Sequence, residues 1–251
     1  MSIINAFDPF SDEIIKPSAA VPSVKGFPET VISGLSREFS DIIKERFCPE
    51  EISSIDVCGM KFPVYRFEYK RHTLGYYHTC LGGACAAGML EHAIAMGGKR
   101  FLFFGSCGSL DKKISAGHFI VPNAAYRDEG TSYHYAPPSD YIEIKTADKL
   151  SEILSELDIP HIKTKTWTTD AFFRETVNQA DLRRSEGCGA VDMECASLMA
   201  CGQFRDADVY QFLYAADCLD GGTWDERILS HTPEGLQKLI ADTALETAIR
   251  L

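Results

Sequence analysis

Three features that mark whole classes of protein are missing from this sequence. No apolar stretch approaches the roughly 20 residues that a membrane-spanning helix needs. No cluster of five basic residues occurs, and 25 Lys and Arg against 36 Asp and Glu give a formal net charge of −11, which argues against a nucleic-acid-binding surface. The first ten residues lack the basic and apolar segments of a secretion signal. We therefore expect a cytoplasmic protein without a membrane or nucleic-acid partner.

Paired cysteine motifs are also absent. The nine cysteines are an odd number and are scattered without a C-x-x-C pair. Most of them are expected to be reduced thiols in the core, as in cytosolic proteins. We predict neither a metal nor a redox cofactor.

The sequence does contain an alternation of strand-like and helix-like segments over its 251 residues. Residues 1–28 are spotted with Pro and Ser, which predicts an irregular N-terminal arm. Residues 29–251 are predicted to form a single α/β domain with a mixed sheet. Strands are expected at 30–32, 61–80 (an antiparallel pair), 101–104, 118–122, 161–166 and 208–217. Helices are expected at 36–47, between the glycine pairs 82–83 and 97–98, and at 147–157, 176–185, 192–205 and 233–249.

The most informative segment runs from residue 101 to residue 110. Its first four residues are bulky and apolar without polar alternation, which is typical of a central strand buried on both faces. The run then stops at a predicted glycine-flanked turn, Gly105 to Gly108, and open α/β folds place ligands in the loop after such a strand. Ser106 and the backbone N–H groups of this turn are suited to an anion. No Lys or Arg lies between residues 101 and 111, so a cation must come from elsewhere.

The residues alone leave two other interpretations of this segment open. It can be a tight strand-to-helix turn that binds nothing. Cys107 can also be a nucleophile, as in cysteine hydrolases, which requires a histidine partner that the sequence does not place. A cysteine is more often a small buried apolar residue.

A second segment places two carboxylates around Met193. Asp192 and Glu194 lie about 200° apart on a helix, so only one of them needs to face a cleft. In the purely structural interpretation they provide a negative charge at a helix N-terminus, which contributes only about 0.5 kcal/mol to stability. In the functional interpretation Glu194 accepts two hydrogen bonds from sugar hydroxyls while Met193 packs on the sugar's apolar face.

A third segment ends an apolar strand with Asp217. A carboxyl is costly to bury unless it is paired or protonated, and burial is how a general acid with a raised pKa is made. The alternative is a loop carboxylate in water. Phe172 and Phe173 can stack on a planar base, although aromatic residues are usually core residues.

Together these segments resemble the nucleoside phosphorylase/nucleosidase superfamily, in the branch of purine and uridine phosphorylases. The resemblance covers roughly residues 60–220 and depends on an ordered set of segments: the Gly-Ser-Cys-Gly turn, Val-Asp-Met-Glu-Cys-Ala from residue 191, and Asp217 at the end of a late strand. Residues 126–132 and 169–176 are also similar to family segments. The resemblance implies a three-layer α/β/α sandwich with a mixed, partly barrel-like sheet. It also implies a homo-oligomer, a dimer or a trimer of dimers, in which a neighbour reaches into each active site.

The resemblance also implies a role for the residues around the nucleoside. Met193 and Glu194 would bind ribose, with Glu194 holding the 2′- and 3′-hydroxyls. Phe172 would pack against the base. Asp217 would be the acid that protonates, or hydrogen-bonds, N7 of a departing purine. The implied reaction is phosphorolysis of the N-glycosidic bond to free base and ribose 1-phosphate, with inorganic phosphate as co-substrate.

Phosphate would be held by Gly105, Ser106 and the surrounding backbone N–H groups, but the family's usual cation is missing. Family phosphorylases commonly carry an arginine two residues before the first glycine of the turn, where this sequence has Phe103. We assign phosphate to Arg37 of the same chain and to Arg66 of a neighbouring subunit. The other arginines that could serve are Arg127 and Arg174 in the same chain and Arg71 of a neighbour.

Two departures from the family pattern bear on the reaction and the substrate. Nucleosidases that cleave with water also lack the arginine that Phe103 replaces, so hydrolysis is an alternative. Uridine phosphorylases carry Gln and Arg after the stacking Phe to read uracil, where this chain has Thr176 and Asn178. Together with Asp217 this favours a purine. We therefore predict a purine nucleoside phosphorylase, with a nucleosidase, a uridine-directed phosphorylase and a nucleoside-binding protein without turnover as alternatives.

Overall fold

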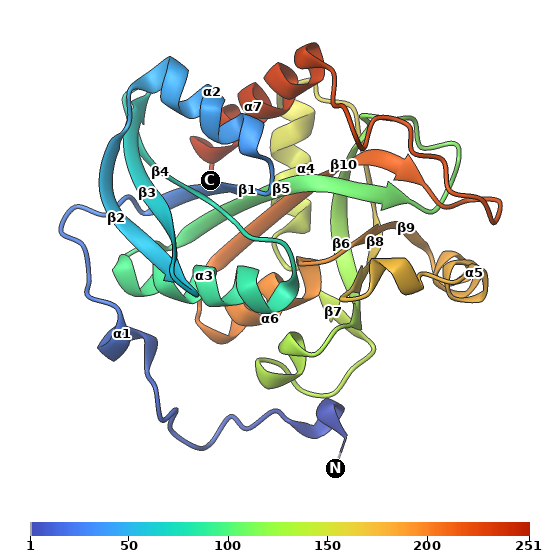
Figure 1. Cartoon of the computed structure of the whole chain (residues 1–251), viewed down its shortest axis with the longest axis horizontal. Coiled ribbons are helices and arrows are strands. Elements are labelled where there is room, and N and C mark those ends of the chain that lie inside the picture. The colour runs from blue at the N-terminus through green and yellow to red at the C-terminus, as the bar shows by residue number, and fades with distance from the viewer. Residues whose placement is uncertain (1) are drawn as a thin grey trace.

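Ten strands form one continuous mixed sheet with helices on both sides of it (Figure 1) in the computed structural model of the chain, which describes residues 2–251. The strands are β1 (Thr30–Gly34), β2 (Glu50–Val57), β3 (Met60–Tyr69), β4 (His72–His78), β5 (Arg100–Ser109), β6 (Phe119–Asp128), β7 (Tyr141–Glu143), β8 (His161–Thr169), β9 (Cys188–Asp192) and β10 (Asp208–Cys218). The helices are α1 (Pro17–Ala20), α2 (Arg37–Phe47), α3 (Gly83–Met96), α4 (Ala147–Glu156), α5 (Val177–Ser185), α6 (Cys195–Phe204) and α7 (Glu234–Ala248). Single turns of 3-10 helix form η1 (Ile3–Asn5), η2 (Thr131–His134) and η3 (Phe172–Arg174).

The sheet closes into a barrel at one end. Its strand order is β10-β6-β8-β9-β5-β1-β4-β3-β2, β7 pairs with β6, and β10 pairs a second time, with β5. Strands β5 and β10 are parallel to each other and antiparallel to their other barrel neighbours, β9 and β6. Figure 1 shows α2 and α7 on one side of the sheet and α3 and α6 on the other. The predicted mixed α/β fold with a partly barrel-like sheet between helical layers is confirmed.

Strand β5 is longer than the sequence predicted, and the predicted glycine-flanked turn is wrong. The strand continues to Ser109, and both Gly105 and Gly108 pair with β10. Neither glycine has a positive φ. Close packing requires them instead, because a Cβ on Gly105 would lie 2.8 Å from Leu35 Cδ1 and one on Gly108 would lie 2.6 Å from Leu219 Cδ1. The segment that was expected to be a loop is therefore a rigid part of the barrel wall.

Helices α3 and α6 approach closely because their contact residues are small. A Cβ on Gly83 would lie 2.2 Å from Ser197 Oγ, so the first turn of α3 is pressed against α6. The contact places the backbone N–H of Gly82 2.7 Å from Glu194 Oε1 at the start of α6. The packing of two small-residue helices thus orients a side chain that the sequence analysis assigned to ribose.

Residues 2–28 precede the sheet and contain only η1 and α1 as regular structure. The segment contacts the end of α6, where Glu13 pairs with Arg205 at 2.7 Å and the ring of Phe7 lies edge-on to Phe204. Among residues 2–251 no helix is long and apolar enough to cross a membrane. The same residues contain no group of three or more His, Cys, Asp or Glu side chains that could hold a metal ion.

Candidate active site

Five side chains that the sequence analysis singled out line one pocket of about 230 Å³. They are Ser106 of β5, Phe172 of η3, Met193 and Glu194 between β9 and α6, and Asp217 of β10. The rest of the wall consists of Leu81, Cys107, Gly108, Glu175, Val191, Asp192, Leu219 and Leu229. Segments that are more than 100 residues apart in the chain meet here because β5 pairs with both β9 and β10.

Asp217 lies near the end of β10, where a bulge shifts the register against β5. Ala215 is opposite Cys107, and Asp217 is opposite the next β5 residue, Gly108. The Asp217 side chain is buried, and Trp224 Nε1 donates a hydrogen bond to its Oδ2 at 2.8 Å. Burial raises the pKa of Asp217, although the Trp224 hydrogen bond opposes that shift. Asp217 thus keeps its proton to a higher pH than a solvated carboxyl does, which is the property that a general acid needs.

Asp192 is a structural carboxylate. Its Oδ1 accepts hydrogen bonds from the hydroxyls of Thr166 at 3.0 Å and Thr168 at 2.9 Å. Its Oδ2 accepts the backbone N–H groups of Glu194 at 2.8 Å and Cys195 at 2.6 Å, where α6 begins. These four bonds satisfy the carboxylate and cap the helix, so Asp192 is the carboxyl of this segment that serves the helix start.

Glu194 is the other carboxyl of the segment, and it faces the pocket. It is 4% exposed and accepts a hydrogen bond from the backbone N–H of Gly82. Burial and the charge of Asp192 raise the pKa of Glu194 to about 8. A carboxyl with one hydrogen bond from the protein can still accept bonds from ligand hydroxyls. The adjoining thioether of Met193 lines the same pocket.

One pocket residue and one residue that supports the pocket were missed by the sequence analysis. Glu175 follows η3 directly and lines the pocket, and burial and the charge of Asp217 raise its pKa to about 7. Trp224 does not line the pocket, but it holds Asp217 through its indole N–H. Glu175 lies in the segment 169–176 that is similar to the family, but the sequence analysis gave it no role, and Trp224 lies outside the segments that carry the resemblance. The only sequence signals were the position of Glu175 after an aromatic pair and that of Trp224 after a late strand.

The aromatic residues after β8 form an exposed pair. The rings of Phe172 and Phe173 are 3.9 Å apart between centroids, and Phe172 is 47% exposed while Phe173 is 87% exposed. The interpretation of both as core residues is therefore wrong. Phe172 lines the pocket, and Phe173 extends into solvent next to it.

Arg37 lies at the sheet edge to which the phosphate site was assigned. It is exposed at the start of α2, three residues after Gly34, which pairs with Phe104 of β5. Its charge acts on the imidazole of His78 and on the carboxylate of Glu38. Arg37 is close to the Ser106 end of β5 but does not line the pocket.

Arg66 and Arg127 have partners within the chain. Arg66, on β3, donates to Glu50 Oε2 at 2.6 Å and to the carbonyl of Gly26 at 3.2 Å, far from the pocket of its own subunit. Arg127 is buried, with Nε 2.8 Å from Ser132 Oγ, NH1 2.7 Å from the Pro137 carbonyl, and its guanidinium over a tyrosine ring. Arg127 is therefore a structural residue. Arg71 lies in the exposed β3–β4 turn, and Arg174 is exposed beside Phe173.

The other two residues that raised questions in the sequence are buried. Phe103 is fully buried against Tyr77, so this position supplies no charge to the pocket. The Cys107 thiol is also buried, and burial together with the nearby charges of Asp192 and Asp217 raises its pKa well above the usual value. No histidine among residues 2–251 lines the pocket. A Cys107 nucleophile therefore has neither a thiolate nor a base.

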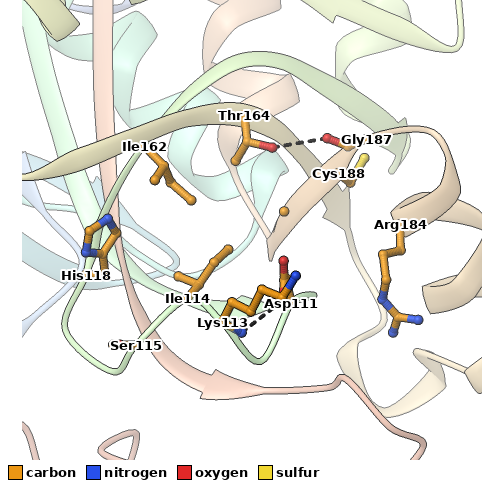
Figure 2. A pocket seen from close by; sticks show the side chains of 11 residues that line it. Asp111, Lys113, Ile114, Ser115, His118, Ile162, Thr164, Arg184, Gly187 and Cys188 are labelled. Atoms are coloured by element: carbon orange, nitrogen blue, oxygen red, sulfur yellow. Dashed lines mark hydrogen bonds between the residues drawn. The ribbon is translucent and has the colours of Figure 1, made fainter.

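A larger hollow of about 530 Å³ lies elsewhere on the molecule and contains none of the predicted site residues (Figure 2). Figure 2 shows Thr164 and Gly187 joined by a hydrogen bond on its wall, with Oγ1 donating to the carbonyl at 3.1 Å. The guanidinium of Arg184 donates to the Leu110 carbonyl and pairs with Asp181, so its charge is already engaged. Because the residues of the predicted site line the smaller pocket, that pocket is the candidate active site.

Similarity to known proteins identifies the class of protein to which the chain belongs. The sequence profile of the phosphorylase superfamily matches residues 30–246, so the chain belongs to that superfamily. Over 147 residues it is 26% identical to a guanosine phosphorylase from Halorubrum lacusprofundi, and this match covers 56% of this chain and 59% of that protein. Over 117 residues it is 32% identical to a uridine phosphorylase from Thermococcus kodakarensis, and this match covers 42% of this chain and 42% of that protein. The chain thus spans about half the length of the curated relatives it matches.

Solved structures share the fold over nearly the whole chain. The structure of uridine phosphorylase from Vibrio fischeri superimposes with a TM-score of 0.75 at 21% identity, covering 96% of this chain and 100% of that one. Purine nucleoside phosphorylase from Toxoplasma gondii, in complex with immucillin-H, gives a TM-score of 0.73 at 16% identity, covering 96% and 98%. At these identities the likeness shows the fold alone.

Proposed function

We propose that the chain is a nucleoside phosphorylase that cleaves the N-glycosidic bond of purine nucleosides with inorganic phosphate. One observation carries this proposal: a single pocket of about 230 Å³ is lined by a hydroxyl, an apolar ring and two carboxyls with raised pKa values, Ser106, Phe172, Glu194 and Asp217. Relatives of the chain include phosphorylases of guanosine and of uridine. The choice of a purine rests on Asp217.

Cleavage of the N-glycosidic bond builds negative charge on the departing base and positive charge on the sugar. Asp217 relieves the first charge by donating its proton to N7 of the purine, and burial raises the pKa of this carboxyl, which favours the protonated form. Trp224 donates to one oxygen of the carboxyl, so the other oxygen is left to face the base. The phosphate dianion beneath the sugar relieves the second charge and then attacks C1′, which yields ribose 1-phosphate.

Ribose is held in the same pocket by Glu194 and Met193. Glu194 accepts the 2′- and 3′-hydroxyls while the N–H of Gly82 keeps its carboxyl in place. Because the pKa of Glu194 is about 8 in the free protein, nucleoside binding releases a proton below that pH. Met193 packs against the apolar face of the sugar.

Phosphate is assigned to Ser106, which is exposed in the pocket, to the backbone around Gly105, and to Arg37. Arg66 joins this site only from a neighbouring subunit, because in its own chain it is paired with Glu50 on a distant strand. The proposal therefore includes a homo-oligomer, a dimer or a trimer of dimers. Two large apolar side chains of the pocket wall that are exposed, Leu81 and Leu229, support a partner there.

No metal or redox cofactor takes part in the proposed reaction, and phosphate is a co-substrate. Five of the nine cysteines are buried free thiols, which fits a protein of the cytoplasm, where thiols stay reduced.

The test is base release from inosine, guanosine, adenosine and uridine, each with and without phosphate. We expect purine release that requires phosphate and yields ribose 1-phosphate. Equal release without phosphate would show a nucleosidase, for which the buried Phe103 is the supporting observation. Cleavage of uridine alone would refute the role of Asp217, and binding of nucleosides without any release would refute an enzyme.

A further inference from the structure

Two cysteines flank the loop that holds the carboxyl assigned to ribose. Cys80 follows the end of β4 by two residues, and Cys85 lies in the first turn of α3. Both are half-buried free cysteines. The proposed reaction gives neither of them a role, and neither lines the pocket.

Contacts between the loop and α3 bring the two thiols together. The backbone N–H of Cys80 donates to Met89 Sδ at 3.5 Å. Met89 follows Cys85 by four residues, so the two side chains lie on one face of α3, and helical side chains lean toward the N-terminus. Cys80 therefore faces the side of the helix that carries Cys85. A hydrogen bond joins the two thiols.

This arrangement is suited to an intramolecular disulfide. The bond requires side chains that converge and Cα atoms within about 7 Å of each other. Two thiols that already form a hydrogen bond have converging side chains, so only a small movement of the backbone is needed. The bonded sulfur atoms are about 2.05 Å apart, which is closer than any non-bonded contact, so bond formation draws Cys80 toward Cys85.

The residues between the two cysteines belong to the candidate active site. Leu81 lines the pocket, and the backbone N–H of Gly82 donates to Glu194 Oε1 at 2.7 Å. The start of α3 cannot move closer to α6, because a Cβ on Gly83 would already lie 2.2 Å from Ser197 Oγ. The loop must therefore adjust when the cysteines are drawn together. Gly82, with a φ of +93°, is the residue of this loop with the most conformational freedom.

We propose that Cys80 and Cys85 form a modification site, at which a low-molecular-weight disulfide oxidises the two thiols to an intramolecular disulfide that moves the Gly82 N–H away from Glu194 and reversibly weakens nucleoside binding. The consequence for binding rests on the proposed function, because Glu194 must be the ribose acceptor. Formation of the disulfide does not depend on that function.

The oxidation balances with one small disulfide, R–S–S–R. The Cys85 thiol loses its proton and attacks one sulfur, so a mixed disulfide forms and the first RS⁻ leaves. The Cys80 thiol loses its proton and attacks Cys85 Sγ, which releases the second RS⁻. The two RS⁻ take up the two protons, so the protein loses two electrons and R–S–S–R becomes two RSH. Burial and the neighbouring Cys85 thiol raise the pKa of Cys80 to about 11, which makes Cys80 the poorer first nucleophile.

Peptide mapping tests the disulfide directly. The reduced protein is incubated with oxidised glutathione, the remaining thiols are alkylated, and the protein is cleaved with trypsin. One tryptic peptide, residues 72–99, contains both cysteines and no other. We expect its mass to be two hydrogens below that of the dithiol peptide, without an alkyl group. Recovery of a doubly alkylated peptide, or of one with glutathione on a single cysteine, would overturn the proposal.

Steady-state kinetics test the consequence for the ribose site. After oxidation the KM for inosine should rise about 10- to 100-fold, because a hydrogen bond that holds a charged acceptor is lost. The KM for phosphate should stay within twofold, and dithiothreitol should restore both values. Cys85→Ser and Cys80→Ser should not respond to oxidised glutathione. Cys58→Ser, which removes an exposed thiol from the β2–β3 turn, is the matched control and should respond like the wild type.

The pH dependence of binding tests the link through Gly82. The hydrogen bond from Gly82 lowers the pKa of Glu194, which burial and the charge of Asp192 raise to about 8. Without that bond Glu194 keeps its proton to a higher pH, so the pH below which nucleoside affinity falls should be higher in the oxidised protein. Oxidation leaves the other carboxyls near Glu194 in place, which are those of Asp170, Glu175 and Asp217. An affinity that falls with an unshifted pH profile would refute the link.

Failure of this inference and failure of the proposed function have different signatures. If nucleosides are cleaved but no disulfide forms, or if it forms and the KM for inosine stays within twofold, only the inference fails. If no nucleoside is cleaved, the proposed function fails, and the peptide map still shows whether the disulfide forms. Calorimetric titration of the reduced and oxidised protein with inosine then measures the coupling, and equal affinities would overturn it. The wild-type measurements decide the matter even if the serine variants do not fold.

Discussion

Replacement of Asp217 by Asn tests the central chemical step with little change in shape. Asparagine has the same number of heavy atoms, so it fits between Gly108 and Trp224. Its Oδ1 can accept the indole N–H that now binds Oδ2, at 2.8 Å in the wild type. The amide Nδ2 can then still donate a hydrogen bond to N7 of the base. The substitution removes proton transfer and leaves most contacts in place.

The expected size of the effect follows from this difference. General acid catalysis by a positioned side chain typically contributes about 10²- to 10⁴-fold in rate. Because the introduced amide would keep a hydrogen bond to N7, the loss should lie in the lower part of that range, about 100- to 1,000-fold in kcat. At about 1.36 kcal/mol per tenfold, this is roughly 3–4 kcal/mol of lost transition-state stabilisation.

Stability should move in the opposite direction or not at all. The folded-state pKa of Asp217 is raised above its unfolded value, so the stability that the protonated form contributes is present below the unfolded pKa and is lost as the pH rises through the folded pKa. At neutral pH the carboxyl therefore tends to oppose folding, and a neutral amide removes that effect. We expect the melting temperature of Asp217→Asn at pH 7 to be equal to or higher than that of the wild type.

The assay compares inosine with 7-methylguanosine, both in saturating phosphate. The methyl group on N7 of the second substrate already supplies the positive charge that Asp217 would otherwise provide, so its cleavage should fall far less than that of inosine. A loss below threefold on inosine, or equal losses on the two substrates, would refute proton donation by Asp217. A lower melting temperature would instead indicate a structural defect.

Three more predictions follow from the site. Glu194→Gln should raise the KM for nucleoside about 10- to 100-fold because hydrogen bonds to a charged acceptor are lost. The affinity of the wild type for nucleoside should fall as the pH drops below about 8, because a proton must then leave Glu194 on binding. The affinity of Glu194→Gln should not change with pH in this range. Arg37→Ala should raise the KM for phosphate at least tenfold, with the KM for nucleoside unchanged, in steady-state kinetics. Asp192→Ala should lower the free energy of unfolding by about 3 kcal/mol in urea titrations, because a helix cap and acceptors for four donors are lost.

Each of these three has a contrary outcome. A wild-type nucleoside affinity that is independent of pH would mean that Glu194 is not the ribose acceptor. An unchanged KM for phosphate in Arg37→Ala would leave the anion to a neighbour's Arg66, which Arg66→Ala then tests. Full stability of Asp192→Ala would show that its donors find other partners, and Asp192→Asn, which keeps two acceptor positions, should be affected less than Asp192→Ala.

The agreement between the predicted and observed bounds of an element depends on how clear the periodicity of its sequence is. Helices such as α2 and α5 lie within one residue of their expected bounds, because polar caps and apolar periodicity mark both ends. Strand β2 was missed, since only Ile55 of its eight residues is buried and no alternation shows. Strand β5 was ended too early because glycine was interpreted as a turn signal, whereas Gly105 and Gly108 make room for neighbouring side chains.

The sequence by itself determined the class of the fold and the residue types of the site. Buried strands, small-residue helices and the ordered segments around Ser106, Glu194 and Asp217 are local properties, and each is visible without knowledge of the neighbours. The resemblance to the family added the expectation that Phe103 stands where a cation is usual, and Phe103 is fully buried.

Only the tertiary structure decided which groups share a pocket and which are already used. Asp192 and Glu194 are equivalent in the sequence, but four hydrogen bonds occupy Asp192 while the packing of α3 on α6 turns Glu194 into the pocket. The guanidinium of Arg127 donates hydrogen bonds to groups of the loop that follows it. Glu175 had no assigned role in its family-like segment, and its place in one pocket with Asp217 comes from pairings between distant strands. Partners of this kind depend on contacts far apart in the chain, which no local pattern records.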